Sequence, residues 1–579
     1  MTKAPIDPVI VAVIGNRLDA ITKEIGETML RTSRSPIFSE ARDFVTAIFD
    51  QSCSLVAQTH YIPVIGGSTP FGQKAISDAF GDDIHEGDVF ILNDPYSGNN
   101  HPPDITITRP VFWEGKLCFW AMAKGHHADV GGGGVVGYNP AAKDVWEEAL
   151  RLPPMKLAEG GKLRQDVFNM ILMNVRVPFL VEGDLKCQMG ATAIGERGIK
   201  GLLAKYGRKT LDAVVEELLR ASEVQVRREI SRIPDGVYKA ERQIDHDGID
   251  KDRMPTIRVA MTVKGEEITF DFSASDPQVR GYLNSPLANT VGAAHLGFFA
   301  CINADIHYNG GAIRPVKVIA PAGTIVNPVA PAPCTACTVP TAETIVETCW
   351  LALAQAIPNQ TQAIWARWCA PATMGIDPRT GRFFADIHFI SKGGGGATQG
   401  FDGWDHIGTV VCLGGLRSPD PELHELVSPY LLLNYEYLPD SAGAGEWRGG
   451  HGVHYRWKVM ADGIPCANFG SGLKPETAPV GIAGGKGSAP YRLSLTHADG
   501  SVDPVDCNSF YTLNKGDVFE ICSSGGGGFG DPRKRPAAKV LADVRDGLVA
   551  LDKAASAYGV VIDPETFAID EAATARARA

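Results

Sequence analysis

The sequence has no long hydrophobic run and no excess of basic residues, and each shortage excludes a class of protein. No uncharged apolar stretch of about eighteen residues occurs, which argues against a transmembrane helix. Lysine and arginine number 55 against 67 aspartate and glutamate residues, a net charge of -12. That balance argues against a nucleic-acid-binding protein, which needs a clustered basic face. The N-terminal apolar stretch is broken by Asp7, Asn16 and Arg17, so it predicts an amphipathic helix and not a secretory signal.

Motifs for ATP binding and for nucleophilic catalysis are also missing. The glycine-rich segments "KGGGGATQG" and "SSGGGGFGDP" lack the lysine and hydroxyl residue of a triphosphate-binding loop, so we expect tight turns or close backbone approach there. No G-x-S-x-G occurs, and no base lies near the cysteines of "PCTACTVP". Cys334 and Cys337 form a single CxxC, which predicts two loop thiols more than a zinc site. The twelve scattered cysteines lie mostly in apolar segments, which is typical of reduced, buried thiols in a cytoplasmic protein.

The chain of 579 residues is too long for one hydrophobic core. Apolar residues recur every three or four positions from Pro8 to about Arg31, which predicts a helix with one buried face. Two β-rich runs then flank the turn "DQSC", which predicts a hairpin with Asp43 just before its first strand. Further helices are expected in three segments: residues 144–152, 164–175 and 186–232.

The pattern changes along the chain and predicts three domains. Alternating strands begin near residue 233, and from about 378 the chain is glycine-rich with short strands. A helical segment over 534–559 and a solvated tail over 570–579 are expected at the end. We therefore expect an α+β, multi-domain mixed fold, with β-hairpins and helices in the N-terminal half and a strand-rich C-terminal half. The predicted domains are a metal-site domain, a mixed α/β domain and a β-rich domain, over residues 1–232, 233–377 and 378–579.

One segment gathers histidines and aspartates at its two ends: "NNHPPDITITRPVFWEGKLCFWAMAKGHHADVGGGG". Its middle contains two strand-like runs joined by "WEGK", which has turn chemistry. If the chain folds back there, Trp113 faces Lys116 and Asp104 lies opposite Gly125, beside His126. Cross-strand neighbours are roughly 5 Å apart, so a plain hairpin brings His101, Asp104, His126 and His127 to one open end.

Imidazole and carboxylate are ligands that zinc, manganese and ferrous iron share, and a site needs three or four of them at one point. "HPPD" offers His101 and Asp104, and "GHHADVGGGG" offers two more histidines and Asp129. Asp43, at the mouth of the other hairpin, could complete the set. The alternative is structural: His101 caps a turn, Asp104 is a solvated carboxylate and the histidine pair is chance. The hairpin geometry favours the metal site, and it leaves the identity of the metal open.

Motifs along nearly the whole chain resemble the hydantoinase B/5-oxoprolinase family. The resemblance is closest to the β subunits of its ATP-dependent lactam hydrolases, of the caprolactamase and N-methylhydantoinase kind. The motifs that carry it are "ARDFVTAIFD", "LNDPYSGNNHPPDITITRPVF", "GHHADVGG", "EEALRLPPMKL", "ILMNVRVP", "GDLKCQMGATAIGERGI", "YLPDSAGAGEWRGGHGV" and "GGGGFGDP".

The resemblance implies one divalent metal, most often zinc, with ligands at Asp43, His101, Asp104 and His126. It implies that His127 and Asp129 act beside the metal or the substrate. It also implies an ATP-binding partner, the hydantoinase A-type α subunit, which phosphorylates the substrate's amide or enol oxygen in an (αβ)2 assembly. The "SGNN" before His101 departs from many relatives, which have a glycine and a threonine there. That departure is expected to alter the pocket wall without removing a ligand.

The function expected from this resemblance is metal-dependent hydrolysis of a lactam or hydantoin activated in the partner subunit, for example caprolactam to 6-aminohexanoate. His127 or Asp129 is the expected proton shuttle. Two alternatives remain open. One is the metal subunit of an acetone- or acetophenone-type ATP-dependent carboxylase. The other is a structural scaffold in which the metal only ties the hairpins together.

Overall fold

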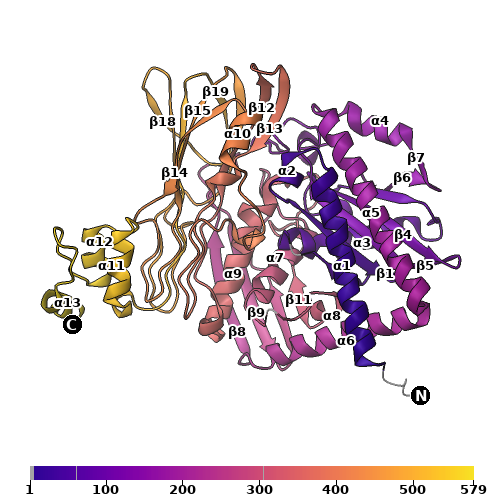
Figure 1. Ribbon diagram of the computed structural model, residues 1–579, viewed down its shortest axis with the longest axis horizontal. Helices are drawn as coiled ribbons and strands as arrows, with labels where there is room; N and C mark the ends of the chain where they lie inside the picture. Colours follow the sequence, from indigo (N-terminus) through magenta and orange to yellow (C-terminus); the bar gives the residue numbers. More distant parts are fainter. Residues whose placement is uncertain (1–5, 60, 304) are drawn as a thin grey trace. The chain divides into compact units, whose positions relative to one another are not determined.

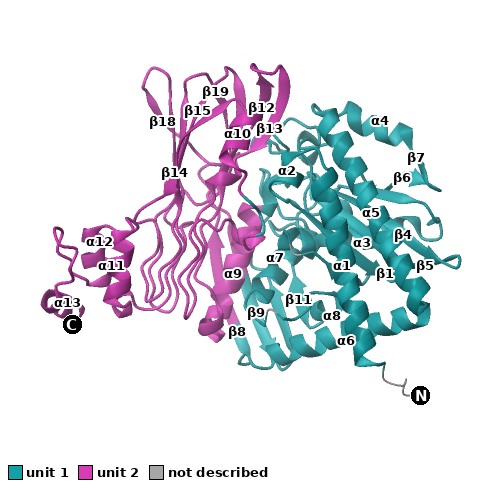
Figure 2. Cartoon of the chain, viewed as in Figure 1, with its two compact units in different colours: residues 1–237, 259–338, 415–417 teal, residues 238–258, 339–414, 418–579 magenta. Residues whose placement is uncertain are grey.

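The computed structural model describes residues 6–59, 61–303 and 305–579. The chain divides into two compact units, shown in different colours in Figure 2: one comprises residues 1–237, 259–338 and 415–417, and the other residues 238–258, 339–414 and 418–579. The predicted three-domain division, with boundaries at 233 and 378, stays a prediction. Among the described residues, no helix is both long and apolar enough to span a membrane.

The first unit is built on a seven-stranded sheet with strand order β2-β1-β5-β4-β3-β6-β7. Strands β9, β10 and β11 form a further sheet, in which β10 pairs antiparallel with β9 and parallel with β11. The strands are β1 (Phe44–Asp50), β2 (Leu55–Gln58), β3 (Val89–Leu92), β4 (Asp104–Trp113), β5 (Lys116–His126), β6 (Met155–Glu159), β7 (Lys162–Leu163), β9 (Thr256–Lys264), β10 (Glu267–Asp271) and β11 (Val316–Ile319). The helices are α1 (Pro8–Thr32), α2 (Pro36–Ser39), α3 (Pro63–Phe80), α4 (Gln165–Met173), α5 (Pro178–Tyr206), α6 (Arg208–Ile230), α7 (Leu287–Phe299) and α8 (Gly310–Ile313).

Helices cover both faces of the seven-stranded sheet, because successive strand side chains point to opposite sides. Trp120 on β5 belongs to a buried cluster with Ile76 of α3. The next residue, Ala121, faces Gly195 of α5, where an added Cβ would lie 2.8 Å from the alanine methyl. Helices α1 and α5 pack against each other beside the sheet (Figure 1). The central strands are therefore buried on both faces, which makes β5 a rigid support for the residues at its end.

Most of the predicted local structure of this unit is confirmed, with one correction. The first helix begins at Pro8 as expected, with the Asp7 side chain accepting a hydrogen bond from the Val9 N–H. Strands β1 and β2 form the expected antiparallel hairpin. The helix expected over 144–152 is wrong: that segment holds only a short 3-10 turn at Val145–Glu147. The Asp144 side chain caps that turn, and Glu148 points into the protein to bind backbone N–H groups of Cys334 and Thr335.

The second unit contains two antiparallel sheets with a shared hydrophobic core. Their strand orders are β13-β12-β16-β19 and β14-β15-β20-β17-β18. Buried side chains from both sheets, Phe384 and Cys466 from one and Trp457 and Phe519 from the other, belong to a single core cluster. The strands are β8 (Gly236–Gln243), which enters this unit at Tyr238, β12 (Cys369–Asp377), β13 (Arg382–Ile387), β14 (Tyr430–Tyr437), β15 (Val453–Val459), β16 (Ile464–Gly470), β17 (Arg492–Thr496), β18 (Val502–Pro504), β19 (Ser509–Leu513) and β20 (Val518–Cys522). The helices are α9 (Pro340–Ala356), α10 (Pro421–Val427), α11 (Ala537–Arg545), α12 (Leu551–Tyr558) and α13 (Glu571–Arg578).

The glycine-rich segments of the second unit lie against one another as extended chains. Figure 1 draws them as coil segments that run side by side. Backbone hydrogen bonds join them: Gly450 N–H donates to the Gly395 carbonyl, and Gly526 N–H donates to the Gly450 carbonyl. A Cβ added at Gly526 would lie 2.0 Å from the Gly395 carbonyl oxygen. Side chains are excluded at this spacing, so the glycines serve the close backbone approach that the sequence predicts.

The C-terminal segment, predicted as a solvated tail, is largely exposed as expected but is helical. Residues Glu571–Arg578 form helix α13, whose first turn is capped by the Asp570 side chain. Arg578 donates hydrogen bonds to the carbonyl oxygens of Tyr558 and Arg535. These bonds hold the last turn against the preceding helices, so the composition of the tail is a poor guide to its structure.

Candidate metal centre

The hairpin of β4 and β5 brings Asp104 and His126 directly opposite each other. Trp113 pairs with Lys116 at the turn, as the sequence predicts. The predicted pairing of Asp104 with Gly125 is wrong by one residue, because a β-bulge between Val111 and Phe112 shifts the register. The bulge moves Asp104 from a position beside His126 to one facing it, and so tightens the cluster.

Three of the predicted ligands lie together at this open end of the hairpin. His101 Nε2 is 2.9 Å from Asp104 Oδ1, and His126 Nδ1 is 3.4 Å from the same oxygen. All three residues are at most 3% exposed, and one ligand atom from each lies within 4.8 Å of the others. The three side chains are therefore shielded from bulk solvent, which weakens the screening of their charges.

Asp43 reaches the same place from the neighbouring strand. It immediately precedes β1, which pairs with β5 so that Phe44 faces Gly125. The His126 N–H donates to the Asp43 carbonyl oxygen, and Asp43 Oδ2 is 4.0 Å from His126 Nδ1. Asp43 is thus the most distant of the four predicted ligands, but it borders the same imidazole.

The hydrogen bonds around His101 show what the cluster is suited to hold. His101 Nδ1 lies 2.7 Å from the carbonyl oxygen of Thr335, which can only accept, so Nδ1 carries the ring proton. In the neutral imidazole, Nε2 then presents its lone pair to the Asp104 carboxylate. Two acceptors facing each other at 2.9 Å need a cation or a second proton between them. His126 Nε2, also buried, makes no hydrogen bond with any described residue. This donor set fits a divalent ion bound by neutral imidazoles and carboxylates.

The electrostatics of the two carboxylates differ sharply. Burial raises the pKa of Asp43 to about 7; the charge of Asp104 also raises it, while His126 lowers it. Burial also raises the pKa of Asp104. The imidazoles of His101 and His126 outweigh burial and hold that pKa well below the usual range. The two carboxylates therefore differ in how readily they ionise. A bound cation would favour the ionised form of both.

His127 and Asp129 lie outside the cluster. His127 Nε2 is 2.9 Å from Gln188 Oε1. Because the Gln188 amide nitrogen donates to the carbonyls of Ile105 and Ala123, its oxygen must accept, and His127 Nε2 carries the proton. His127 Nδ1 therefore holds a buried lone pair, and it has no hydrogen-bond partner among the described residues.

The Asp129 carboxylate anchors the loop that follows His127. It accepts hydrogen bonds from the backbone N–H of Gly131 and from the backbone and guanidinium of Arg176. These contacts occupy both of its oxygens. Asp129 is placed to hold the loop after β5, and the structure does not bring it to the three-residue cluster.

Three residues that contact or border the cluster escaped sequence-based prediction. The Asn100 amide donates to Asp104 Oδ2 and fixes the orientation of that carboxylate. Thr335, in the "CTAC" segment, supplies the carbonyl that orients His101. Lys124, two residues before His126, is buried with its Nζ 2.8 Å from Ser68 Oγ, and burial lowers its pKa to about 8. The unusual "SGNN" before His101 was the one sequence signal for Asn100. No local pattern points to Thr335 or Lys124.

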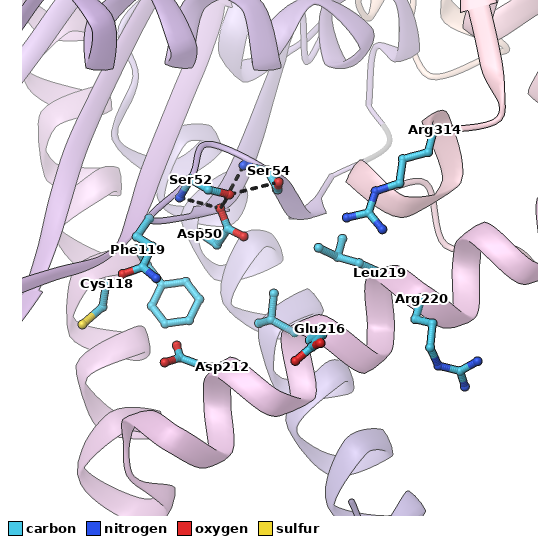
Figure 3. Close-up of a pocket in the computed structure, with 12 residues that line it drawn as sticks. Asp50, Ser52, Ser54, Cys118, Phe119, Asp212, Glu216, Leu219, Arg220 and Arg314 are labelled. Carbon is cyan, nitrogen blue, oxygen red and sulfur yellow. Dashed lines mark hydrogen bonds between the residues drawn. The ribbon is translucent and has the colours of Figure 1, made fainter. Parts of the chain in front are cut away.

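A cavity of about 460 Å³ in the same unit lies away from this cluster (Figure 3). Its lining includes Asp50, at the far end of β1 from Asp43, together with Phe119 of β5 and Arg314. A strand rises about 3.3 Å per residue, so roughly 20 Å of β1 separates the two ends. The cavity is therefore not the pocket of the metal cluster.

Comparison with known proteins gives a consistent picture over the whole chain. A family model described as Hydantoinase B/oxoprolinase matches residues 7–532. The beta subunit of caprolactamase from Pseudomonas jessenii is 37% identical over 99% of both chains. A putative D-/L-hydantoinase subunit from Pseudomonas sp. strain NS671 is 31% identical over 96% of this chain and 95% of that one.

Two solved structures resemble this one closely. The crystal structure of the ATP-dependent caprolactamase from Pseudomonas jessenii covers 99% of this chain and 100% of its own, with a TM-score of 0.93 and 36% identity. A nucleotide-free acetone carboxylase covers 99% of this chain and 82% of its own, with a TM-score of 0.91 and 20% identity. At that low identity the second likeness shows the fold alone. The likeness to caprolactamase confirms the expected mixed α+β fold.

Proposed function

The chain belongs to the hydantoinase B/oxoprolinase family, and from that premise we propose that it is the metal-carrying β subunit of an ATP-dependent hydrolase of cyclic amides. The observation that carries the proposal is the convergence of His101, Asp104 and His126. The Thr335 carbonyl holds the proton on His101 Nδ1, so the unprotonated Nε2 faces the Asp104 carboxylate. The relatives named as a caprolactamase subunit and a putative hydantoinase subunit support lactams or hydantoins as the substrate class.

Asp43, His101, Asp104 and His126 would hold one divalent ion, with zinc the first choice and manganese or iron the alternatives. When bound, such an ion lowers the pKa of water and polarises a carbonyl, which is the chemistry that hydrolysis of an activated amide needs at neutral pH. Asn100 and the Thr335 carbonyl orient two of the four side chains. Burial of the cluster keeps bulk water from competing with the substrate.

His127 is the stronger of the two candidates for moving a proton. Its Nδ1 has a lone pair and no hydrogen-bond partner among the described residues, while Gln188 holds the protonated Nε2. Asp129 is engaged by Gly131 and Arg176, so its proposed contribution is to position the loop that carries His127. Both roles remain proposals for catalysis.

The proposed partner is an ATP-binding, hydantoinase A-type α subunit in an (αβ)2 assembly, since the sequence has no ATP-binding motif and a relative is itself named as a β subunit. Phosphorylation in that partner would turn the amide oxygen into a good leaving group. We place the complex in the cytoplasm, because the cysteines are reduced thiols and all but Cys53 and Cys522 are buried.

The test is an assay of this chain with its ATP-binding partner on caprolactam, hydantoins and 5-oxoproline, with and without ATP. We expect the ring-opened acid (an amino acid from a lactam, an N-carbamoyl amino acid from a hydantoin), ADP and phosphate to form together, and only with ATP. Incorporation of labelled bicarbonate into an acetone or acetophenone product would instead identify the carboxylase, whose fold is shared. Metal removal that lowers stability without affecting turnover would support a purely structural ion.

A further inference from the structure

A second group of metal-ligating side chains lies in the other compact unit, at the end of β13. Asp386 is on β13, His388 follows it, and His424 comes from helix α10. One ligand atom from each of the three lies within 4.8 Å of the others. His388 is fully buried and the side chains of Asp386 and His424 are 15% and 6% exposed. This is the composition of a two-histidine, one-carboxylate site.

The contact between His424 and Asp386 has the spacing of two ligands around one ion. His424 Nε2 is 3.3 Å from Asp386 Oδ2, yet it makes no hydrogen bond with this or any other described residue. With ligand distances of about 2.1 Å, the edge of a coordination tetrahedron is about 3.4 Å. A buried imidazole nitrogen without a hydrogen bond costs free energy unless something else binds it. The nitrogen therefore lies beside the Asp386 carboxylate without a hydrogen bond that satisfies it.

The surroundings of His388 fix its ring in one orientation and are compatible with metal binding. Its Nδ1 lies 3.2 Å from the Tyr455 hydroxyl, which can accept the ring proton, while Thr373 Oγ1 is 3.5 Å from Nε2. Its ring stacks on Trp457 with centroids 4.3 Å apart, so its orientation is fixed by packing. If Nδ1 carries the ring proton, the lone pair of Nε2, which makes only the long contact with Thr373 Oγ1, can turn to a metal.

Two other clusters in this unit lack these features. His246 Nδ1 accepts the Gly248 backbone N–H, so the proton sits on Nε2, the atom that faces Asp506 and Cys507. That hydrogen bond satisfies the imidazole without an ion. His454 is similarly satisfied, with Nε2 2.6 Å from Glu520 Oε1, and it is about a third exposed. The Asp386 cluster is thus distinguished by its buried nitrogen without a hydrogen bond.

We propose that Asp386, His388 and His424 bind a second divalent transition-metal ion, of the zinc class, distinct from the ion proposed in the first unit. The ion ties helix α10 to the end of β13, beside the contacts that Arg379 makes with the carbonyls of Glu425 and Ser428. Three protein ligands leave a coordination position for water.

Metal stoichiometry of the full-length chain tests this directly. Chelator-stripped protein is titrated with Zn²⁺ and with Co²⁺, and bound metal is counted by mass spectrometry and by the Co²⁺ absorption spectrum. We expect two ions per wild-type chain and one in His424→Phe, a ring of similar shape that keeps the packing against Tyr430 but offers no nitrogen. His497→Gln, which removes another histidine paired with an aspartate, is the matched control and should still bind two.

The two sites are separated by comparing variants. His101→Ala should lose one ion and keep the spectrum of the Asp386 site, while the double variant with His424→Phe should bind none. Equal stoichiometry in wild type and His424→Phe overturns this inference and leaves the first site untouched. Should His424→Phe fail to fold, Asp386→Asn serves in its place, and the wild-type Co²⁺ titration alone decides between one and two equivalents.

Discussion

Asp104 and His126 face each other across β4 and β5, with Oδ1 and Nδ1 3.4 Å apart. The pairing exists because a bulge at Val111 and Phe112 absorbs one residue of the hairpin. Without it, Asp104 would face Gly125 and the carboxylate would sit one position from the imidazole it contacts. The bulge lies at the turn end of the hairpin, so a local irregularity sets the geometry of the site at the other end.

Removing the imidazole of His101 should abolish the metal centre. His101→Ala deletes a ligand that the Thr335 carbonyl holds in place, so metal at this site and ATP-dependent turnover should both fall by more than the ~10- to 100-fold that loss of an outer partner costs. Metal content and product formation in the complex with the partner subunit measure this. His85→Ala, at an exposed histidine of the same unit, is the control and should change neither. Full activity in His101→Ala would contradict the assignment.

Asn100→Ala tests the support of the carboxylate. The amide donates to Asp104 Oδ2, and its loss frees the carboxylate to rotate, so metal affinity should weaken about 10- to 100-fold. Competition titration with a chelating dye measures the change. Asn139→Ala removes an amide that bonds the Glu147 carbonyl instead, and it should leave the affinity unaltered. Equal affinity in both variants would show that the Asn100 contact does not orient the ligand.

The glycine segments should tolerate no side chain. In Gly526→Ala the new methyl would lie 2.0 Å from the Gly395 carbonyl oxygen, so the free energy of unfolding should fall by about 1–3 kcal/mol or more. Gly190, within α5, has nothing within 4 Å of an added Cβ. Gly190→Ala should therefore raise the free energy of unfolding by up to ~1 kcal/mol through helix propensity. Urea unfolding of the two variants gives the comparison, and the same sign in both would refute the close-packing account.

Asp405 should make stability depend on pH in the acid range. Burial raises its pKa, but hydrogen bonds from His451 and the charge of Arg448 outweigh burial and lower it to about 2 from an unfolded value near 3.8. A lowered folded pKa stabilises the protein fully above about pH 4, and that contribution is lost as pH falls toward 2. The difference is about 1–2 kcal/mol after allowance for partial exposure.

Asp405→Asn should accordingly lower stability at pH 7 and flatten its decline between pH 4 and 2, as measured by unfolding at a series of pH values. Asp78→Asn, which breaks an exposed pair with Lys74, is the control and should leave the acid limb as steep as in wild type. A wild-type slope in Asp405→Asn would rule out this carboxylate as its source.

Local features of the fold could be predicted because their causes are local. The helix at Pro8, the β1–β2 hairpin and the turn at Glu114 and Gly115 follow from the spacing of apolar residues and from turn chemistry. Composition failed where tertiary contacts override it. In the segment after Asp144, Glu148 turns inward to bind the backbone of Cys334 and Thr335 and no α-helix forms. At the C-terminus, Arg578 holds the last turn of an exposed helix against Tyr558.

The sequence by itself determined that imidazoles and carboxylates would meet at the open end of one hairpin, because a tight turn fixes which strand ends lie together. The bulge that sets the exact pairing was visible only in the structure. Tertiary structure alone decided which ring nitrogen of His101 carries the proton, because the Thr335 carbonyl comes from a distant part of the chain. It also paired Asp129 with Arg176. It also brought His424 to Asp386 from a separate helix. Side-chain periodicity records only neighbours along one element, whereas these contacts depend on how distant segments pack.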